Sequence, residues 1–107
     1  MDPQATYDEI ADDLAARHPE VELGQMMGMP ALKAGGKMIG GFSRAEGAMA
    51  FKLPDPDERE RALALEGAHL FDPGGRGRPM KEWVAVPATH AGLWPELADR
   101  AVTHRAG

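Results

Sequence analysis

Glycines divide residues 21–53 into short extended pieces, and this punctuation constrains the fold more than any other feature of the chain. Gly35 and Gly36 lie between two largely apolar segments, residues 31–34 and 37–42. Two adjacent glycines that both tolerate positive φ suit the two-residue turn of a β-hairpin. Gly47 lies in the expected turn before a further extended piece. Strands joined by turns this short pair antiparallel, so this region predicts an antiparallel sheet.

The first helix is expected at the N-terminus. Thr6 and Glu9 have the spacing of a capping box, in which each side chain bonds to the backbone N–H of the other residue. Apolar residues of one helical stripe accompany them, namely Tyr7, Ile10, Ala11, Leu14 and Ala15. The helix should end at His18, because a residue that precedes proline avoids helical backbone angles.

Two further helices are expected. Asp55 and Pro56 predict the N-cap and first position of a middle helix, which we expect to run to Gly67. A C-terminal helix is predicted with Pro95 in its first turn, where proline is tolerated. Its apolar stripe comprises Leu93, Trp94, Leu97, Ala98, Ala101 and Val102.

A second hairpin is expected at residues 70–86. A short apolar run leads into a glycine-rich loop, and an alternating strand that begins at Trp83 follows. We expect residues 74–79 to form the tip, which carries Arg76 and Arg78, with Lys81 beside it. An arginine guanidinium can bind a carboxylate or a phosphate with two hydrogen bonds. Arg76, Arg78 and Lys81 are therefore candidate binding residues.

These elements predict an α+β fold in a single domain, residues 1–107. The expected architecture is an antiparallel β-sheet of about five to six strands flanked by N-terminal, middle and C-terminal helices. A chain of 107 residues can bury one modest core. We expect that core to include Leu14, Leu63, Trp83, Val84, Leu97 and Ala101.

Composition excludes several classes of protein. The chain has no cysteine, which rules out disulfides and thiolate metal sites and is compatible with a reducing compartment. It has no apolar run of the about 18 residues needed to cross a bilayer, and its N-terminus lacks the apolar segment of a signal peptide. We therefore expect a cytoplasmic protein that does not bind membranes.

Charge is unevenly distributed along this acidic chain, whose formal net charge is −5. The first 20 residues carry six acids against Arg17 alone, whereas residues 21–53 carry more basic than acidic side chains. A protein of this kind gains little from long-range attraction to DNA. Lys37 and Lys52 either contribute to a local basic face or are simply solvated.

Residues that would carry catalysis or bind a metal are scarce or badly spaced. The histidines lie at positions 18, 69, 90 and 104, so no two share a helix face as metal ligands. Residues 31–38, ALKAGGKM, resemble a phosphate-binding loop but lack its first glycine and its final serine or threonine. The acids gather at helix N-termini, where capping explains them. We therefore expect no catalytic residue, no cofactor and no metal.

Three methionines, Met26, Met27 and Met29, make one loop more apolar than a loop requires. Methionine is flexible and fills irregular gaps, so core packing with the methionines elsewhere in the sheet (Met38, Met49 and Met80) is the simpler interpretation. An adaptable surface that binds a partner is the alternative. Trp83 likewise has two interpretations, core packing or stacking on a base or an arginine.

Several short segments follow one another in a characteristic order. They are Gln25-Met26-Met27-Gly28, Gly35-Gly36-Lys37-Met38, Phe51-Lys52-Leu53, Gly67-Ala68, Phe71, Gly77-Arg78-Pro79-Met80 and Trp83-Val84-Ala85-Val86-Pro87. In this order and spacing, residues 5–105 resemble the N-terminal domain of the TfoX/Sxy family, within the wider YjbR-like group. Gln25 stands where the family has arginine, and Met27 where it has phenylalanine.

That resemblance implies an antiparallel sheet flanked by helices and a regulatory role without catalysis. TfoX-type proteins are associated with the activation of bacterial competence genes, as transcription co-regulators. We expect a stand-alone domain without the C-terminal domain of the full-length regulators, and we therefore do not assign competence regulation.

The expected function is that of a small, non-enzymatic bacterial regulatory or protein-interaction module. Candidate partner-binding residues are Arg76, Arg78, Lys81, Lys37, Lys52, Met26, Met27 and Met29. Two alternatives stay open: weak nucleic-acid binding through the basic hairpin at residues 74–78, and a small-molecule binder or enzyme, which would need a concave site. We expect a protein partner rather than nucleic acid, and a monomer or homodimer.

Overall fold

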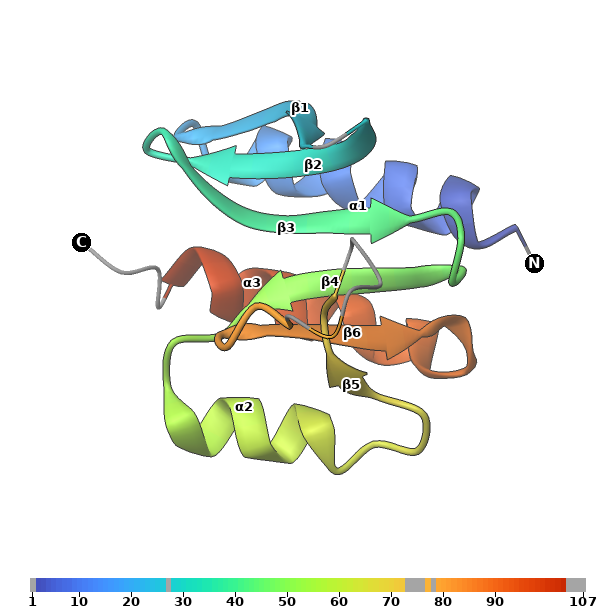
Figure 1. The fold of residues 1–107 in the computed structure, drawn as a ribbon. Coiled ribbons are helices and arrows are strands. Elements are labelled where there is room, and N and C mark those ends of the chain that lie inside the picture. The colour runs from blue at the N-terminus through green and yellow to red at the C-terminus, as the bar shows by residue number, and fades with distance from the viewer. Residues whose placement is uncertain (1, 27, 73–76, 78, 104–107) are drawn as a thin grey trace.

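The computed structural model describes residues 2–26, 28–72, 77 and 79–103, which form one sheet with helices packed against it (Figure 1). In chain order the elements are α1 (Pro3–Arg17), β1 (Val21–Met26), β2 (Met29–Ala34), β3 (Lys37–Ser43), β4 (Ala48–Lys52), α2 (Pro56–Leu63), β5 (His69–Leu70), β6 (Trp83–Pro87), the 3₁₀-helix η1 (Ala88–Leu93) and α3 (Trp94–Thr103). The six strands lie in the order β1-β2-β3-β4-β6-β5, and every neighbouring pair is antiparallel. The predicted α+β fold is confirmed.

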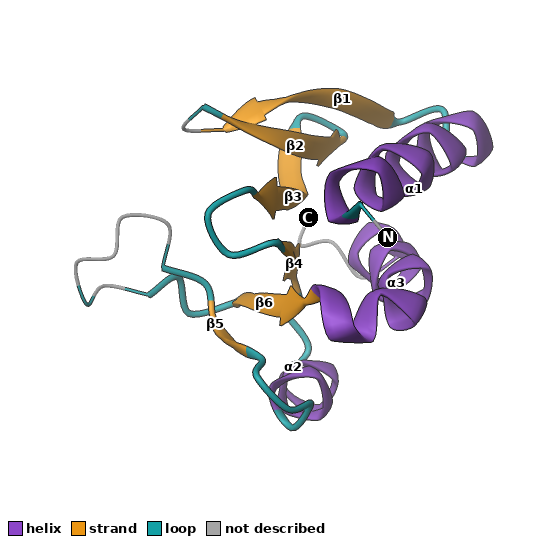
Figure 2. Cartoon of the chain, turned by 90° about the vertical axis from the view of Figure 1, so that its right-hand side faces the viewer, coloured by secondary structure: helices purple, strands orange, loops and turns teal. Residues whose placement is uncertain are grey.

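The helices lie on one side of the sheet. Figure 2 views the sheet along its edge, with α1 and α3 against one face and α2 beside the end formed by β6 and β5. No helix of the described residues lies on the opposite face, which we call the helix-free face. Figure 1 looks onto this face, with α1 and α3 behind the strands.

Both predicted hairpins are present. Gly35 and Gly36 have φ of 58° and 82°, and they join β2 to β3 in the predicted two-residue turn. β5 pairs antiparallel with β6, so that Leu70 lies opposite Val84. The predicted tip of this second hairpin, residues 74–79, lies largely outside the described residues. Local turn chemistry therefore identified the β2–β3 connection correctly.

The first helix begins earlier than predicted. Asp2 is the N-cap of α1, and its carboxylate accepts a hydrogen bond from the backbone N–H of Gln4 at 3.0 Å. Pro3 occupies the first turn, where its fixed φ favours helix initiation. The predicted capping box is wrong, because Thr6 lies within the helix and its hydroxyl donates to the Asp2 carbonyl at 3.3 Å. The helix ends at His18, as predicted.

The middle helix begins as predicted and ends earlier. Asp55 caps α2, with its carboxylate accepting a backbone N–H at 3.0 Å. The helix stops at Leu63 rather than at Gly67, because the backbone N–H groups of Leu65 and Ala68 bond to carbonyls only three residues earlier. These tighter turns end the α-helix. Gly67 then takes a φ of 85° in the turn that leads to β5.

The main core lies between the helices and the sheet. Its largest fully buried side chains are Trp94, Phe51, Leu14, Leu32, Ile39, Met49, Leu53, Val84, Val86 and Val102. Of the predicted core positions, Leu14, Trp83, Val84 and Ala101 are buried.

Leu63 and Leu97 are only partly buried, and the core prediction was wrong at these two positions. Leu97 faces a hollow between α2 and α3 instead of a packed surface. Trp94, the first residue of α3, is fully buried instead, and its indole N–H donates to the Val86 carbonyl at 3.1 Å. The unpredicted η1 precedes α3 and leads the chain from β6 to Trp94.

Candidate interaction surface

The helix-free face has a floor of small residues. Across the strands, Gly24 pairs with Ala31, Ala31 with Gly41, Gly41 with Ala50, and Ala50 with Ala85. Directly opposed residues of neighbouring strands point to the same face of a sheet. This row, which we call the small-residue row, therefore crosses five strands and presents nothing larger than a methyl group. It leaves room above it for a large side chain.

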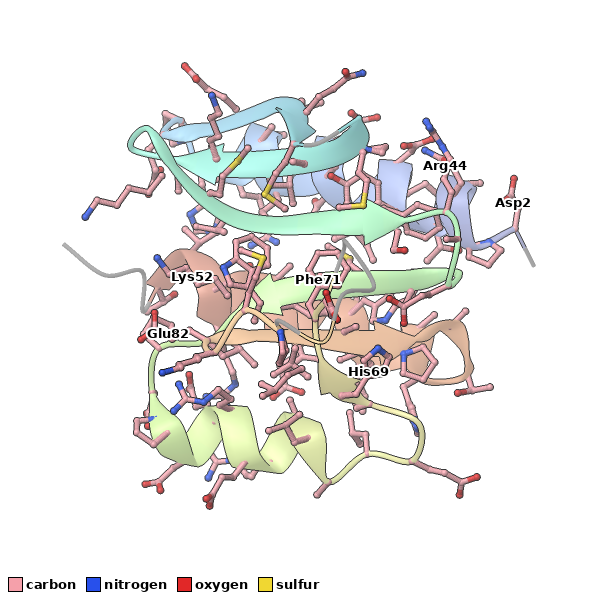
Figure 3. All side chains as sticks on the ribbon, in the orientation of Figure 1. Asp2, Arg44, Lys52, His69, Phe71 and Glu82 are labelled. Atoms are coloured by element: carbon pink, nitrogen blue, oxygen red, sulfur yellow. The ribbon has the colours of Figure 1, made fainter. Side chains whose placement is uncertain are left out.

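Phe71 fills that room and closes a second, smaller core. Its side chain is fully buried and packs with Trp83 and three alanines, the two rings lying 6.4 Å apart. The backbone on either side is held by hydrogen bonds, from Phe71 N–H to the Trp83 carbonyl (2.9 Å) and from Met80 N–H to the Phe71 carbonyl (2.8 Å). Figure 3 shows Phe71 over the middle of the helix-free face. Sequence reasoning missed this core residue, because one aromatic residue next to a turn carries no periodic signal.

Trp83 belongs to the same core. Its side chain is 5% exposed. Core packing, the simpler of its two interpretations, is confirmed. A buried indole offers no surface on which a base or an arginine could stack.

Four methionines surround this second core, each partly buried: Met26, Met29, Met38 and Met80. Met26 and Met29 are direct cross-strand partners at the β1–β2 turn. Met49 points to the opposite face and is fully buried in the main core. Met27 lies outside the described residues. We call the group of Met26, Met29, Met38 and Met80 the methionine surface.

The candidate lysines divide between the two faces. Lys52 pairs with Trp83 and so belongs to the helix-free face, while Lys81 is exposed immediately after Met80. Lys37 lies opposite Ala34, a residue of the main core, so it is directed to the helix side of the sheet. Figure 3 places Lys52 and Glu82 at the same end of the helix-free face, which therefore carries both signs of charge. The remaining candidates, Arg76 and Arg78, lie outside the described residues.

Two of the three described histidines, His69 and His90, bond to neighbouring groups. His69 contacts the Glu46 carboxylate through Nε2 at 2.7 Å and the Gly67 carbonyl through Nδ1 at 3.2 Å. His90 Nε2 bonds to the Glu66 carbonyl at 2.9 Å. Within the described ranges, no three His, Cys, Asp or Glu side chains lie close enough together to hold a metal ion.

A hollow of about 200 Å³ lies between α2 and α3, on the helix side of the molecule. Its apolar walls include Leu65, Leu93 and Leu97, and Leu93 is 39% exposed. Arg100 closes one rim through a 2.5 Å bond to the nearly buried Glu58 carboxylate, and this bond raises the pKa of the Arg100 guanidinium. The sequence did not indicate this concavity, because its two walls are far apart in the chain.

A second hollow, of about 320 Å³, lies between α1 and the β1–β2 hairpin. Tyr7 and Ala11 form its inner wall, while Asp8, Asp12 and Leu23 lie nearer the surface. Burial raises the pKa of the Tyr7 hydroxyl well above its usual range, and the neighbouring Asp8 carboxylate adds to this effect.

Comparison with known proteins returned no relative. No family model, no curated protein and no solved structure matches the chain. No helix in the described parts of the chain is long and apolar enough to cross a membrane. The arrangement of side chains on the two faces of the sheet is therefore the basis on which a function is proposed.

Proposed function

We propose that the protein is a non-enzymatic interaction module that binds a partner protein through the methionine surface. The observation that carries this proposal is the convergence of four partly buried methionines, from three segments of the chain, around Phe71. They lie on a sheet face that no described helix covers. Methionine side chains are flexible and polarisable, and they adapt to the shape of a partner.

The surroundings of the methionine surface fit a protein interface. Such interfaces combine an apolar centre, in which methionine is enriched, with a polar rim. Lys52 and Lys81 supply charged groups beside the methionines. The methionines pack against the buried side chains of Phe71 and Trp83, so the backbone of this surface would not have to reorganise on binding.

The resemblance of residues 5–105 to TfoX/Sxy N-terminal domains supports a regulatory role for this module. On that proposal the protein acts in the bacterial cytoplasm as a transcription-accessory factor. Its action there would depend on contacts with another protein and not on a reaction of its own.

A photo-crosslinking experiment in the native host tests the proposal. A photoreactive phenylalanine analogue at Met29 should capture a defined protein partner. The double variant Met26→Gln/Met38→Gln should remove that product, because it replaces two apolar contacts by polar ones. Leu93→Gln is the matched control, since it changes an exposed apolar side chain on the helix side of the molecule. A partner captured equally well in the methionine variant, or from a photoreactive group at position 93, would contradict the assignment.

Nucleic-acid binding is the alternative that must be separated from this proposal. Lys52 and Lys81 are the candidate cations described near the methionine surface, and buried Trp83 offers no stacking platform. We therefore expect no measurable binding of duplex or single-stranded DNA or RNA at about 50 mM salt, where phosphate contacts are strongest. Binding that weakens steeply as salt rises would favour the alternative.

A further inference from the structure

β1 leaves one edge of the sheet open. It is the terminal strand of the sheet and is six residues long, whereas β5 at the other edge has only two residues. Edge strands usually carry charged side chains, a proline or a bulge that discourages pairing with another chain. β1 has neither a proline nor a bulge, because its register with β2 is regular, and Glu22 is its single charged residue. The edge is therefore available to a further strand.

The hydrogen-bond pattern shows which backbone groups face that edge. The N–H of Gly35 donates to the carbonyl of Glu20 at 3.2 Å, and these two residues continue the β1–β2 register by one position beyond its first pair, Val21 and Ala34. Bonded and non-bonded pairs alternate along an antiparallel ladder. Gly24 therefore bonds to β2, while Leu23 and Gln25 direct their N–H and C=O groups away from it. A chain that adds to β1 would bond to these two residues.

Leu23 also presents an apolar side chain at this edge. It is 54% exposed and, with Leu93, is one of two large apolar side chains exposed among the described residues. Its side chain lines the hollow between α1 and the β1–β2 hairpin, together with Asp8 and Asp12. In an added strand, the residue opposite Leu23 would point to the same face and so over this hollow.

The charge around the hollow selects the kind of partner. Asp8 and Asp12 are exposed on successive turns of α1, and neither forms an ion pair within the described residues. A second copy of this chain would bring its own acidic α1 toward this one and would be repelled. An extended segment with lysine or arginine at alternate positions would instead place its cations beside the two carboxylates.

We propose that the outer edge of β1 binds an extended basic peptide segment of a partner protein, which adds a seventh strand to the sheet. Its backbone bonds to Leu23 and Gln25, and its helix-side lysine or arginine side chains occupy the hollow beside Asp8 and Asp12. Main-chain hydrogen bonds supply affinity in this mode of recognition, and the alternate side chains supply specificity. This site shares β1 with Met26 of the methionine surface, but its side-chain contacts lie on the helix side of the sheet, the opposite face from the methionines.

The test uses a defined probe, a fluorescein-labelled peptide of alternating lysine and valine with threonine at both ends. Its matched control carries glutamate in place of every lysine. The wild-type protein should bind the lysine peptide in an anisotropy titration at about 50 mM salt, more weakly at about 500 mM, and should not bind the glutamate peptide. Binding should also protect the amides of Leu23 and Gln25 from hydrogen exchange.

Two pairs of variants separate this site from general attraction to an acidic protein. Asp8→Asn/Asp12→Asn should weaken binding of the lysine peptide about fivefold or more. The control Glu9→Gln/Glu60→Gln removes two exposed charges that do not line the hollow, and it should change the affinity less than about twofold. Leu23→Pro removes an outward N–H at a position that proline tolerates in an edge strand, and it should abolish binding. Leu23→Ala keeps that N–H and should retain most of the affinity.

Several outcomes would overturn the proposal. They are no binding of the lysine peptide, equal loss in the two charge variants, or unchanged binding in Leu23→Pro. A wild-type dimer in sedimentation equilibrium that Leu23→Pro converts to a monomer would show that a second copy occupies the edge. Because Met38→Gln changes the methionine surface on β3, away from β1, it should leave peptide binding unchanged, and failure here is distinguishable from failure of the proposed function.

Discussion

Truncation of Phe71 is the most direct test of the second core. In Phe71→Ala the side chain is removed from a fully buried site whose floor consists of alanines and glycines of the central strands. Those strands are hydrogen-bonded on both sides and cannot move into the space, so the cavity persists. We expect the free energy of unfolding to fall by about 3–5 kcal/mol, the range for phenylalanine truncation in a core that does not collapse. The total free energy of unfolding of a domain of this size is about 5–15 kcal/mol.

Urea unfolding measures this loss, and Leu93→Ala provides the control. Leu93 is 39% exposed, so its truncation should cost less than about 1 kcal/mol. Fluorotryptophan NMR adds a local readout, because the chain has two tryptophans, one in each core. In Phe71→Ala the resonance of Trp83 should shift and that of Trp94 should not. A loss below about 1 kcal/mol in Phe71→Ala would refute the claim that the helix-free face is a packed core.

Three further outcomes test other parts of the structure. Gly41→Ala should lower the free energy of unfolding, measured in urea, by about 1–3 kcal/mol, because the added Cβ would lie 3.0 Å from the Pro30 carbonyl oxygen. Gly24→Ala is the control: its Cβ would meet no atom within 4 Å, so this change should be neutral or slightly stabilising. Leu97→Ala should cost about 1–2 kcal/mol, less than a fully buried leucine, and a larger loss in the same assay would mean that the hollow between α2 and α3 closes around it. The raised pKa of Tyr7 keeps its hydroxyl protonated in the folded state, whereas in the unfolded chain the hydroxyl ionises near pH 10, so the free energy of unfolding should fall as pH rises above about 10. Tyr7→Phe should remove that part of the pH dependence. Tyrosinate absorbance, which reports on the one tyrosine of the chain, should rise only when the protein unfolds.

The parts of the fold that depend on local chemistry could be predicted from the sequence. Gly35 and Gly36 define their turn by backbone freedom alone, and Asp55 begins α2 by bonding to its own neighbours. The start of α1 was missed because Asp2 and Thr6 are both acceptable caps. The choice between them depends on Pro3, whose fixed φ places the first turn.

Burial depends on contacts between distant segments, and there the sequence was less informative. Leu97 and Trp94 share one apolar stripe, but only the placement of α2 shows that the stripe is covered at Trp94 and open at Leu97. The methionines were recognised as a group whose members approach across the sheet, and four of them do so. Phe71, which holds them in place, was not predicted, since its partners are alanines that look unremarkable in sequence.

The small-residue row has a consequence for how this protein can evolve. Phe71 and the row share one fixed volume, so enlarging a residue such as Ala50 should be harmful while Phe71 is present. The same enlargement should partly rescue Phe71→Ala by refilling the cavity, which makes Ala50→Leu a second-site suppressor. Side-chain sizes at position 71 and along the row should therefore vary inversely among descendants of this sequence, as a compensated set whose members rarely change alone.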